Sequence, residues 1–128
     1  MDVSLFRGSN GAIRELSVAL HLMPFEPLRH ITFIGLGCAY FAAERYAQAA
    51  QWIGSAVNAY PESFWAERIA VAAVALTGAR AEARRKARSL LRKDPDLTVA
   101  EARRAWPFRP AFMSRLGDGL EIAELPRV

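Results

Sequence analysis

One spacing recurs through the middle of this chain and restricts its fold more than any other feature. Three pairs of residues share it, each about 34 residues apart: Glu44 with Gly78, Ala49 with Ala83, and Pro61 with Pro95. Glycine suits the left-handed residue after a helix and proline stops a helix, so each pair marks the same point in two successive units. We therefore predict two copies of one helical hairpin, at residues 30–61 and 64–95.

The pattern of apolar residues predicts helices along almost the whole chain. Apolar positions recur at steps of three and four residues, and no stretch alternates with the period of two that a strand requires. The predicted helices cover residues 11–22, 28–43, 46–60, 63–76 and 80–93. Two C-terminal capping helices follow within residues 98–125, and Thr98 with Glu101 forms a capping box at the start of the first. The predicted class is all-α, with about seven helices.

The 128 residues are expected to form a single domain, residues 1–128, because the chain is long enough for one core and too short for two. Residues 1–24 form only a partial repeat, whose helix lacks its partner. A repeat helix without a partner leaves an apolar face uncovered. We therefore expect an upstream domain or a partner protein to cover this face, or the chain to form a homodimer.

The sequence also indicates the cellular compartment of the chain. No apolar run approaches the roughly 18 residues that a membrane-spanning helix needs, so no membrane contact is expected. The N-terminus lacks the basic start and apolar stretch of a secretory signal. The single Cys38 cannot form an internal disulfide. These features favour the reducing cytoplasm.

Few side chains in this sequence could carry out chemistry. His21 and His30 are the only histidines, and neither has the spacing to Cys38 that a metal site or an activated thiol requires. Gly35 and Gly37 fall inside a predicted helix rather than in a phosphate-binding loop. We expect no catalytic residue, no metal site and no cofactor, and therefore no enzyme activity in this chain.

The helix predicted at residues 80–93 carries the strongest charge pattern. Of the 17 basic residues in the chain 15 are arginine, and the formal net charge is +4. Alanine and leucine occupy the inward positions of this helix, so its cations line an outer face without aromatic residues for base stacking. We expect a solvated convex surface and no specific nucleic-acid binding. A nucleic-acid-associated accessory module that uses this helix is the alternative function.

The unit at residues 30–61 resembles a tetratricopeptide repeat. A period of about 34 residues with two helices is the signature of this family. The unit matches the family pattern at Phe33, Leu36, Gly37, Tyr40, Tyr46, Ala49, Ile53, Ala56 and Pro61. The unit at residues 64–95 matches less fully, because Ala70 and Val71 replace the leucine–glycine pair. The resemblance implies a right-handed superhelix of antiparallel helix pairs and a role in protein–protein interaction.

The last segment resembles the C-terminal end of a group of larger bacterial proteins. The similarity lies in Thr98, Arg103, the run from Trp106 to Phe108, and the apolar residues that follow. In that group, tetratricopeptide repeats follow a class III adenylate or guanylate cyclase domain or a transcriptional-regulator domain. The resemblance implies a part of a signalling protein, with any cyclase activity in a domain absent from this chain.

The family resemblance also implies a concave binding groove, lined by the first helix of each pair. The residues facing this groove would be Ile34, Cys38, Phe41, Trp65, Arg68 and Ala72. Tryptophan and arginine are common anchors at interfaces, and an apolar groove favours a helix or a hydrophobic segment as its ligand. The alternative is that the C-terminal helix, or Trp106 and Phe108, fills this groove from within the chain.

Overall fold

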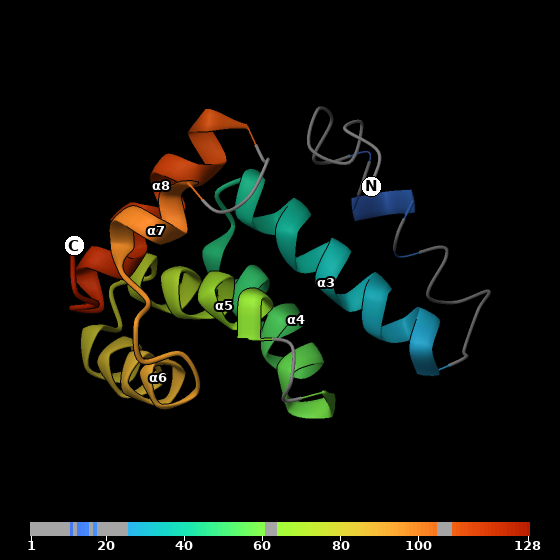
Figure 1. The fold of residues 1–128 in the computed structure, drawn as a ribbon. Helices are drawn as coiled ribbons and strands as arrows, with labels where there is room; N and C mark the ends of the chain where they lie inside the picture. Colours follow the sequence, from blue (N-terminus) through green and yellow to red (C-terminus); the bar gives the residue numbers. More distant parts are fainter. Residues whose placement is uncertain (1–10, 12, 16, 18–25, 61–63, 105–108) are drawn as a thin grey trace.

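The computed structural model describes residues 11, 13–15, 17, 26–60, 64–104 and 109–128. Its helices are α3 (Glu26–Ala42), α4 (Tyr46–Ala59), α5 (Phe64–Leu76), α6 (Arg80–Lys93), α7 (Val99–Arg104) and α8 (Pro110–Ile122) (Figure 1). The described residues contain no strand, so the predicted all-α class is confirmed. Most of the helix predicted at residues 11–22, and of the partial repeat 1–24, lies outside the described residues.

The equivalent turns of the two units, at Glu44 and Gly78, are both left-handed. Glu44 follows α3 with φ of 62°, and Gly78 follows α5 with φ of 97°. The N–H of Arg45 donates to the carbonyl of Tyr40 at 2.9 Å, which closes the end of α3 in a Schellman arrangement. Both predicted turn positions are therefore left-handed, with glutamate in the first turn and glycine in the second.

Helix α5 lies at the centre of the molecule. Helices α3 and α4 pack as one pair and α5 and α6 as a second, while α4 joins the pairs by packing on α5. Helix α5 also packs on α8, and every residue from 69 to 75 is buried. A helix surrounded on all sides must be apolar around its whole circumference, as this one is from Ile69 to Leu76. The packing is consistent with an α-helical superhelix of stacked pairs.

The two helical pairs achieve close packing with opposite distributions of side-chain size. A Cβ added to Gly37 on α3 would overlap the side chain of Ile53 on α4. The equivalent residues of the second unit are Val71 on α5 and Ala87 on α6, which are both buried. The larger side chain is thus on the second helix of the first pair and on the first helix of the second. Val71 is larger than its counterpart Gly37 and Ala87 is smaller than its counterpart Ile53, so the combined volume at the two positions is similar in both units.

Helix α8 packs along α5 and contacts the end of α3. The ring of Phe112 packs on that of Phe41, near the end of α3, with the ring centroids 4.8 Å apart. Gly119 lies so close to α5 that an added Cβ would be 2.6 Å from the carbonyl oxygen of Ala72. The last helix therefore contacts both pairs.

None of the described helices has the length and apolar character needed to cross a bilayer.

Helix α7 begins with hydrogen bonds to the C-terminal tail. The N–H of Val99 donates to the carbonyl of Pro126 at 2.7 Å, and the N–H of Ala100 donates to the carbonyl of Arg127 at 3.1 Å. The Thr98 hydroxyl accepts a hydrogen bond from the N–H of Glu101 at 3.0 Å, as the capping box predicts. The first N–H groups of a helix lack partners within the helix, so the tail stabilises this short element.

Candidate functional site

The six residues predicted to line a concave groove fall into two groups. Trp65 and Arg68 are partly exposed. The buried ones are Ile34, Cys38, Phe41 and Ala72. Helix α8 covers Phe41 and Ala72, so at these positions the C-terminal helix occupies the predicted groove, as in the second of the two alternatives. Trp106 and Phe108 lie outside the described residues.

Arg68 joins two helices through an ion pair. Its Nη2 lies 3.0 Å from Oδ2 of Asp94, the residue that follows α6, and 13% of the Arg68 side chain is exposed. The pair connects the early part of α5 to the end of α6. A neighbouring pair, Lys93 Nζ to Glu67 Oε1 at 3.1 Å, connects the same two helix ends. Arg68 is therefore committed to the packing of the second helical pair.

Cys38 is an unreactive thiol in this fold. Its side chain is fully buried, and burial raises the pKa of the thiol from its ordinary value of 9.0 to about 12. The thiolate is the nucleophilic form, so a group held neutral at physiological pH is inert. Within the described part of the chain, no three His, Cys, Asp or Glu residues are grouped so that they could hold a metal ion.

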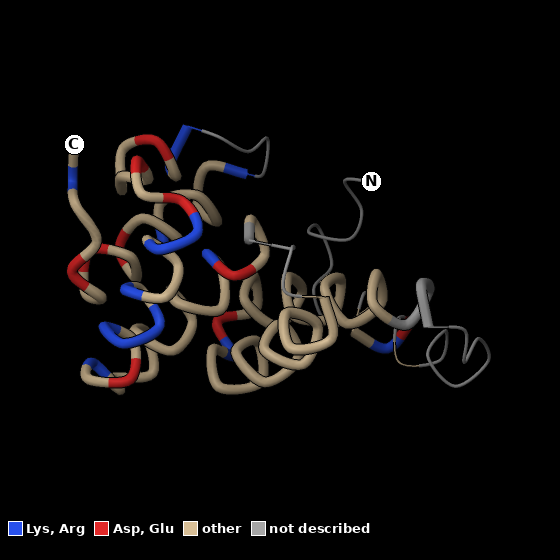
Figure 2. The backbone as a smooth tube through the Cα atoms, turned by 60° about the horizontal axis from the view of Figure 1, so that its bottom comes forward, with Lys and Arg blue, Asp and Glu red and all other residues tan. Residues whose placement is uncertain are grey.

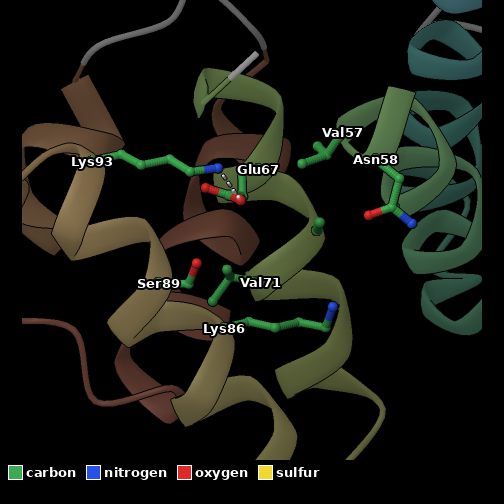
Figure 3. A pocket seen from close by; sticks show the side chains of 9 residues that line it. Val57, Asn58, Glu67, Val71, Lys86, Ser89 and Lys93 are labelled. Carbon is green, nitrogen blue, oxygen red and sulfur yellow. Dashed lines mark hydrogen bonds and ion pairs between the residues drawn. The ribbon is translucent and has the colours of Figure 1, made fainter. Parts of the chain in front are cut away.

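A polar groove lies between α4 and α6, with α5 as its floor (Figure 3). Its volume is about 360 Å³. Each helix contributes three lining residues: Gly54, Val57 and Asn58 from α4, Glu67, Ala70 and Val71 from α5, and Lys86, Ser89 and Lys93 from α6. We call this site the α4–α6 groove. It lies between the second helices of the two pairs, whereas the predicted concave groove lies on the first helices.

Helical spacing explains why these residues share one groove. On α6, Lys86, Ser89 and Lys93 are three and seven residues apart, which places them on one face. Ala83, Ala87 and Leu90 form the buried face beside them. Small residues at Gly54, Ala70 and Ser89 leave the space open. The shape of the groove therefore follows from the pattern of small and polar residues on three helices.

The polar groups of the groove come from all three helices. Lys86 and Lys93, the two lysines of the chain, reach from α6 across α5, and Asn58 faces the same space from α4 (Figure 3). Lys93 is paired with Glu67, whose side chain is 13% exposed. The ammonium group of Lys86 is in no ion pair among the described residues. The groove thus offers one unneutralised cation beside a hydroxyl and an amide.

The first helical pair has aromatic residues at two positions where the groove has charged ones. Glu67 and Lys86 stand in the second unit where Phe33 and Trp52 stand in the first. In the first pair these two rings pack together, with centroids 5.4 Å apart and planes at 45°. In the second pair the same positions carry a carboxylate and an ammonium group that line open space. The groove therefore lies where the second unit has polar residues in place of the packed aromatic pair of the first unit.

The surface beside the groove is strongly basic on one side only. Arg85, Arg88 and Arg92 are exposed on the outer face of α6, and no ion pair in the described part of the chain involves them. Helix α4, on the other side, has no charged residue between Tyr46 and Ala59. Figure 2 shows this contrast between the basic α6 and the uncharged backbone of α4. The groove is thus bordered by a cationic helix and a neutral one.

Sequence reasoning missed the α4–α6 groove, although the sequence contains a signal for it. The apolar pattern places Lys86 and Lys93 only on a solvated basic helix, because their distance from α4 depends on how the pairs stack. Aligning the two units by their common period places Glu67 and Lys86 against Phe33 and Trp52. The polar replacement of a packed aromatic pair is the signal in the sequence for this groove.

Comparisons with protein-family models, with curated proteins and with solved structures found no match for this chain.

Proposed function

We propose that this chain is a non-catalytic protein-interaction module built from tetratricopeptide-type helix pairs. The observation that carries the proposal is the α4–α6 groove, an open polar surface between two stacked pairs. Stacked helical pairs bury their apolar faces against each other and leave extended surfaces for binding. The repeat period, the two left-handed turns and the Gly37–Ile53 contact support the tetratricopeptide assignment.

The setting that we propose is a cytoplasmic signalling protein. The resemblance of the closing segment to proteins with a cyclase or transcriptional-regulator domain supports this setting. The module would then bind its partner while chemistry takes place in a separate domain. A second copy of the chain is one candidate partner, because stacked helical pairs leave extended surfaces for binding.

Photo-cross-linking in cells tests the proposed function. A benzophenone amino acid is placed at Ser89, which lines the α4–α6 groove, and separately at Ser114, which is exposed on α8. We expect a discrete polypeptide adduct at Ser89 and none at Ser114, identified by mass spectrometry of the cross-linked band. Equal labelling at both positions, or adducts that contain no second polypeptide, would reject an interaction role for this groove.

A nucleic-acid-associated accessory module is the alternative function. It is favoured by the exposed row of Arg85, Arg88 and Arg92, which are spaced three and seven residues apart on α6. Phosphate binding by such a row releases counterions, so affinity would fall steeply as salt rises. A salt titration of binding to a labelled oligonucleotide distinguishes the two functions, because a protein bound through a mixed polar and apolar groove responds far less to salt.

A further inference from the structure

We propose that the α4–α6 groove binds an acidic segment of a partner protein, with one carboxylate of that segment held at Lys86. This inference rests on the proposed function and adds the chemistry of the partner to it. The site differs from the concave groove implied by the family resemblance, because its lining comes from the second helices of the pairs and from α5.

The charges inside the groove select a single carboxylate. Glu67 lies 3.1 Å from Lys93 and neutralises it, so that of the two cations lining the groove only Lys86 has no ion pair among the described residues. The Ser89 hydroxyl and the Asn58 amide can each donate a hydrogen bond into the same space. A carboxylate has two oxygens that accept such bonds, and charge-assisted hydrogen bonds are the stronger ones. The three donors therefore suit one acidic side chain.

The borders of the groove select how the segment lies. Helix α4 is uncharged from Tyr46 to Ala59, while Arg85, Arg88 and Arg92 are exposed on α6. A segment in the groove would therefore place further carboxylates along α6 and neutral residues along α4. Complementary charge of this kind speeds association and fixes orientation.

The groove itself is poorly suited to nucleic acid. None of its nine lining residues is aromatic. Single-stranded nucleic acid is bound mainly by stacking on aromatic side chains together with a continuous basic track. A carboxylate on a protein segment needs only the ammonium group of Lys86 and the hydrogen-bond donors beside it. An acidic segment therefore fits the groove better than nucleic acid does.

Nuclear magnetic resonance titration of the full chain tests the inference with defined probes. The probes are a decapeptide of glutamate, a decapeptide of glutamine and a ten-nucleotide strand of thymidines. We expect the glutamate peptide to shift the signals of Gly54, Asn58 and Ser89, and the glutamine peptide to leave them unchanged. Gly54 and Asn58 lie on the uncharged helix α4, so their shifts report on the groove and not on general attraction to α6.

Two matched substitutions on α6 separate the groove from net charge. Lys86→Gln removes the cation inside the groove, and Arg85→Gln removes a cation one residue away on the outer face. We expect Lys86→Gln to weaken glutamate-peptide binding about fivefold, as for the loss of one exposed ion pair, and Arg85→Gln to weaken it less than twofold. Both residues are exposed, so the variants should melt at the temperature of the unmodified chain.

Four outcomes would overturn the inference. Equal weakening by the two substitutions would show attraction to the net charge of α6. Shifts confined to Arg85, Arg88 and Arg92 would place the peptide outside the groove. Tighter binding of the thymidine strand than of the glutamate peptide would favour nucleic acid. If the glutamate peptide fails to bind while Ser89 still cross-links a polypeptide in cells, the acidic partner is wrong and the interaction function stands.

Discussion

At the scale of single residues, glycines inside helices differ in what surrounds them. Gly119 faces the backbone of Ala72 on α5, and Gly37 faces the side chain of Ile53 on α4. Gly54, in contrast, has no atom within 4 Å of the position that a Cβ would occupy. Two of these glycines are required for contact between helices, and the third lines the open groove.

Gly119→Ala should destabilise the protein, whereas Gly54→Ala should stabilise it. The new methyl group at residue 119 would lie 2.6 Å from the Ala72 carbonyl oxygen, and backbone atoms cannot move aside easily. We expect the free energy of unfolding to fall by about 2 kcal/mol. At residue 54 the methyl group fits, and the higher helix propensity of alanine should add about 0.5–1 kcal/mol. Urea unfolding followed by circular dichroism measures both, and a loss of stability at both positions would contradict the geometry.

The thiol of Cys38 should react only when the protein unfolds. Burial raises its pKa to about 12, so the folded protein at pH 8 holds almost no thiolate. A thiol whose pKa is raised by folding favours the folded state below pH 9.0, and this contribution is lost as the pH rises toward about 12. We expect no reaction with Ellman's reagent at pH 8 in buffer and full reaction in urea. Rapid labelling of the folded chain would show that Cys38 is accessible.

At the scale of helices, the sequence predicted most boundaries, but it left the packing of the C-terminal helix as one of two alternatives. Proline, glycine and the apolar period are local signals, so the bounds of α4, α5 and α6 agree with the prediction. Helix α3 begins at Glu26, two residues before the predicted start, with Pro27 in its first turn, where proline is tolerated. The position of α8 depends on contacts between residues far apart in the sequence, such as Phe112 with Phe41 on α3 and Gly119 with Ala72 on α5, which no local pattern reveals.

Rebuilding the aromatic pair in the second unit should close the α4–α6 groove and stabilise the hairpin. The double variant Glu67→Phe with Lys86→Trp places at these positions the residues found at Phe33 and Trp52. An aromatic pair contributes about 1 kcal/mol beyond burial, which exceeds the small value of the partly exposed Glu67–Lys93 ion pair.

The two single variants are the controls for this double variant. Each introduces one ring without its partner, so the sum of their effects on the free energy of unfolding should fall short of the double variant by about 1 kcal/mol. Thermal unfolding of the four proteins measures this coupling. Purely additive effects would show that residues 67 and 86 do not meet as residues 33 and 52 do.

At the scale of the whole molecule, α8 holds the two helical pairs together through Phe112 and Gly119. Phe112→Ala should therefore expose the end of α3 as well as leave a cavity, and we expect the free energy of unfolding to fall by about 3 kcal/mol. Binding of a hydrophobic dye should rise in the same variant, because the ring of Phe41 loses its cover. Phe112→Leu, which keeps most of the volume, should show less than half of this loss. An unchanged unfolding midpoint for Phe112→Ala would mean that α8 is not part of the cooperative core.

The first helical pair combines a small residue, Gly37, with a large one, Ile53, and the second combines Val71 with the smaller Ala87. This difference predicts how the four positions change during evolution. A single substitution at any of these four sites either leaves a void or forces an overlap, so drift at one site is tolerated only after a matching change at its partner. Homologues from other organisms should therefore vary at positions 37 and 53 together, and at 71 and 87 together. Transplanting one complete hairpin into another such stack should succeed more often than exchanging its helices separately.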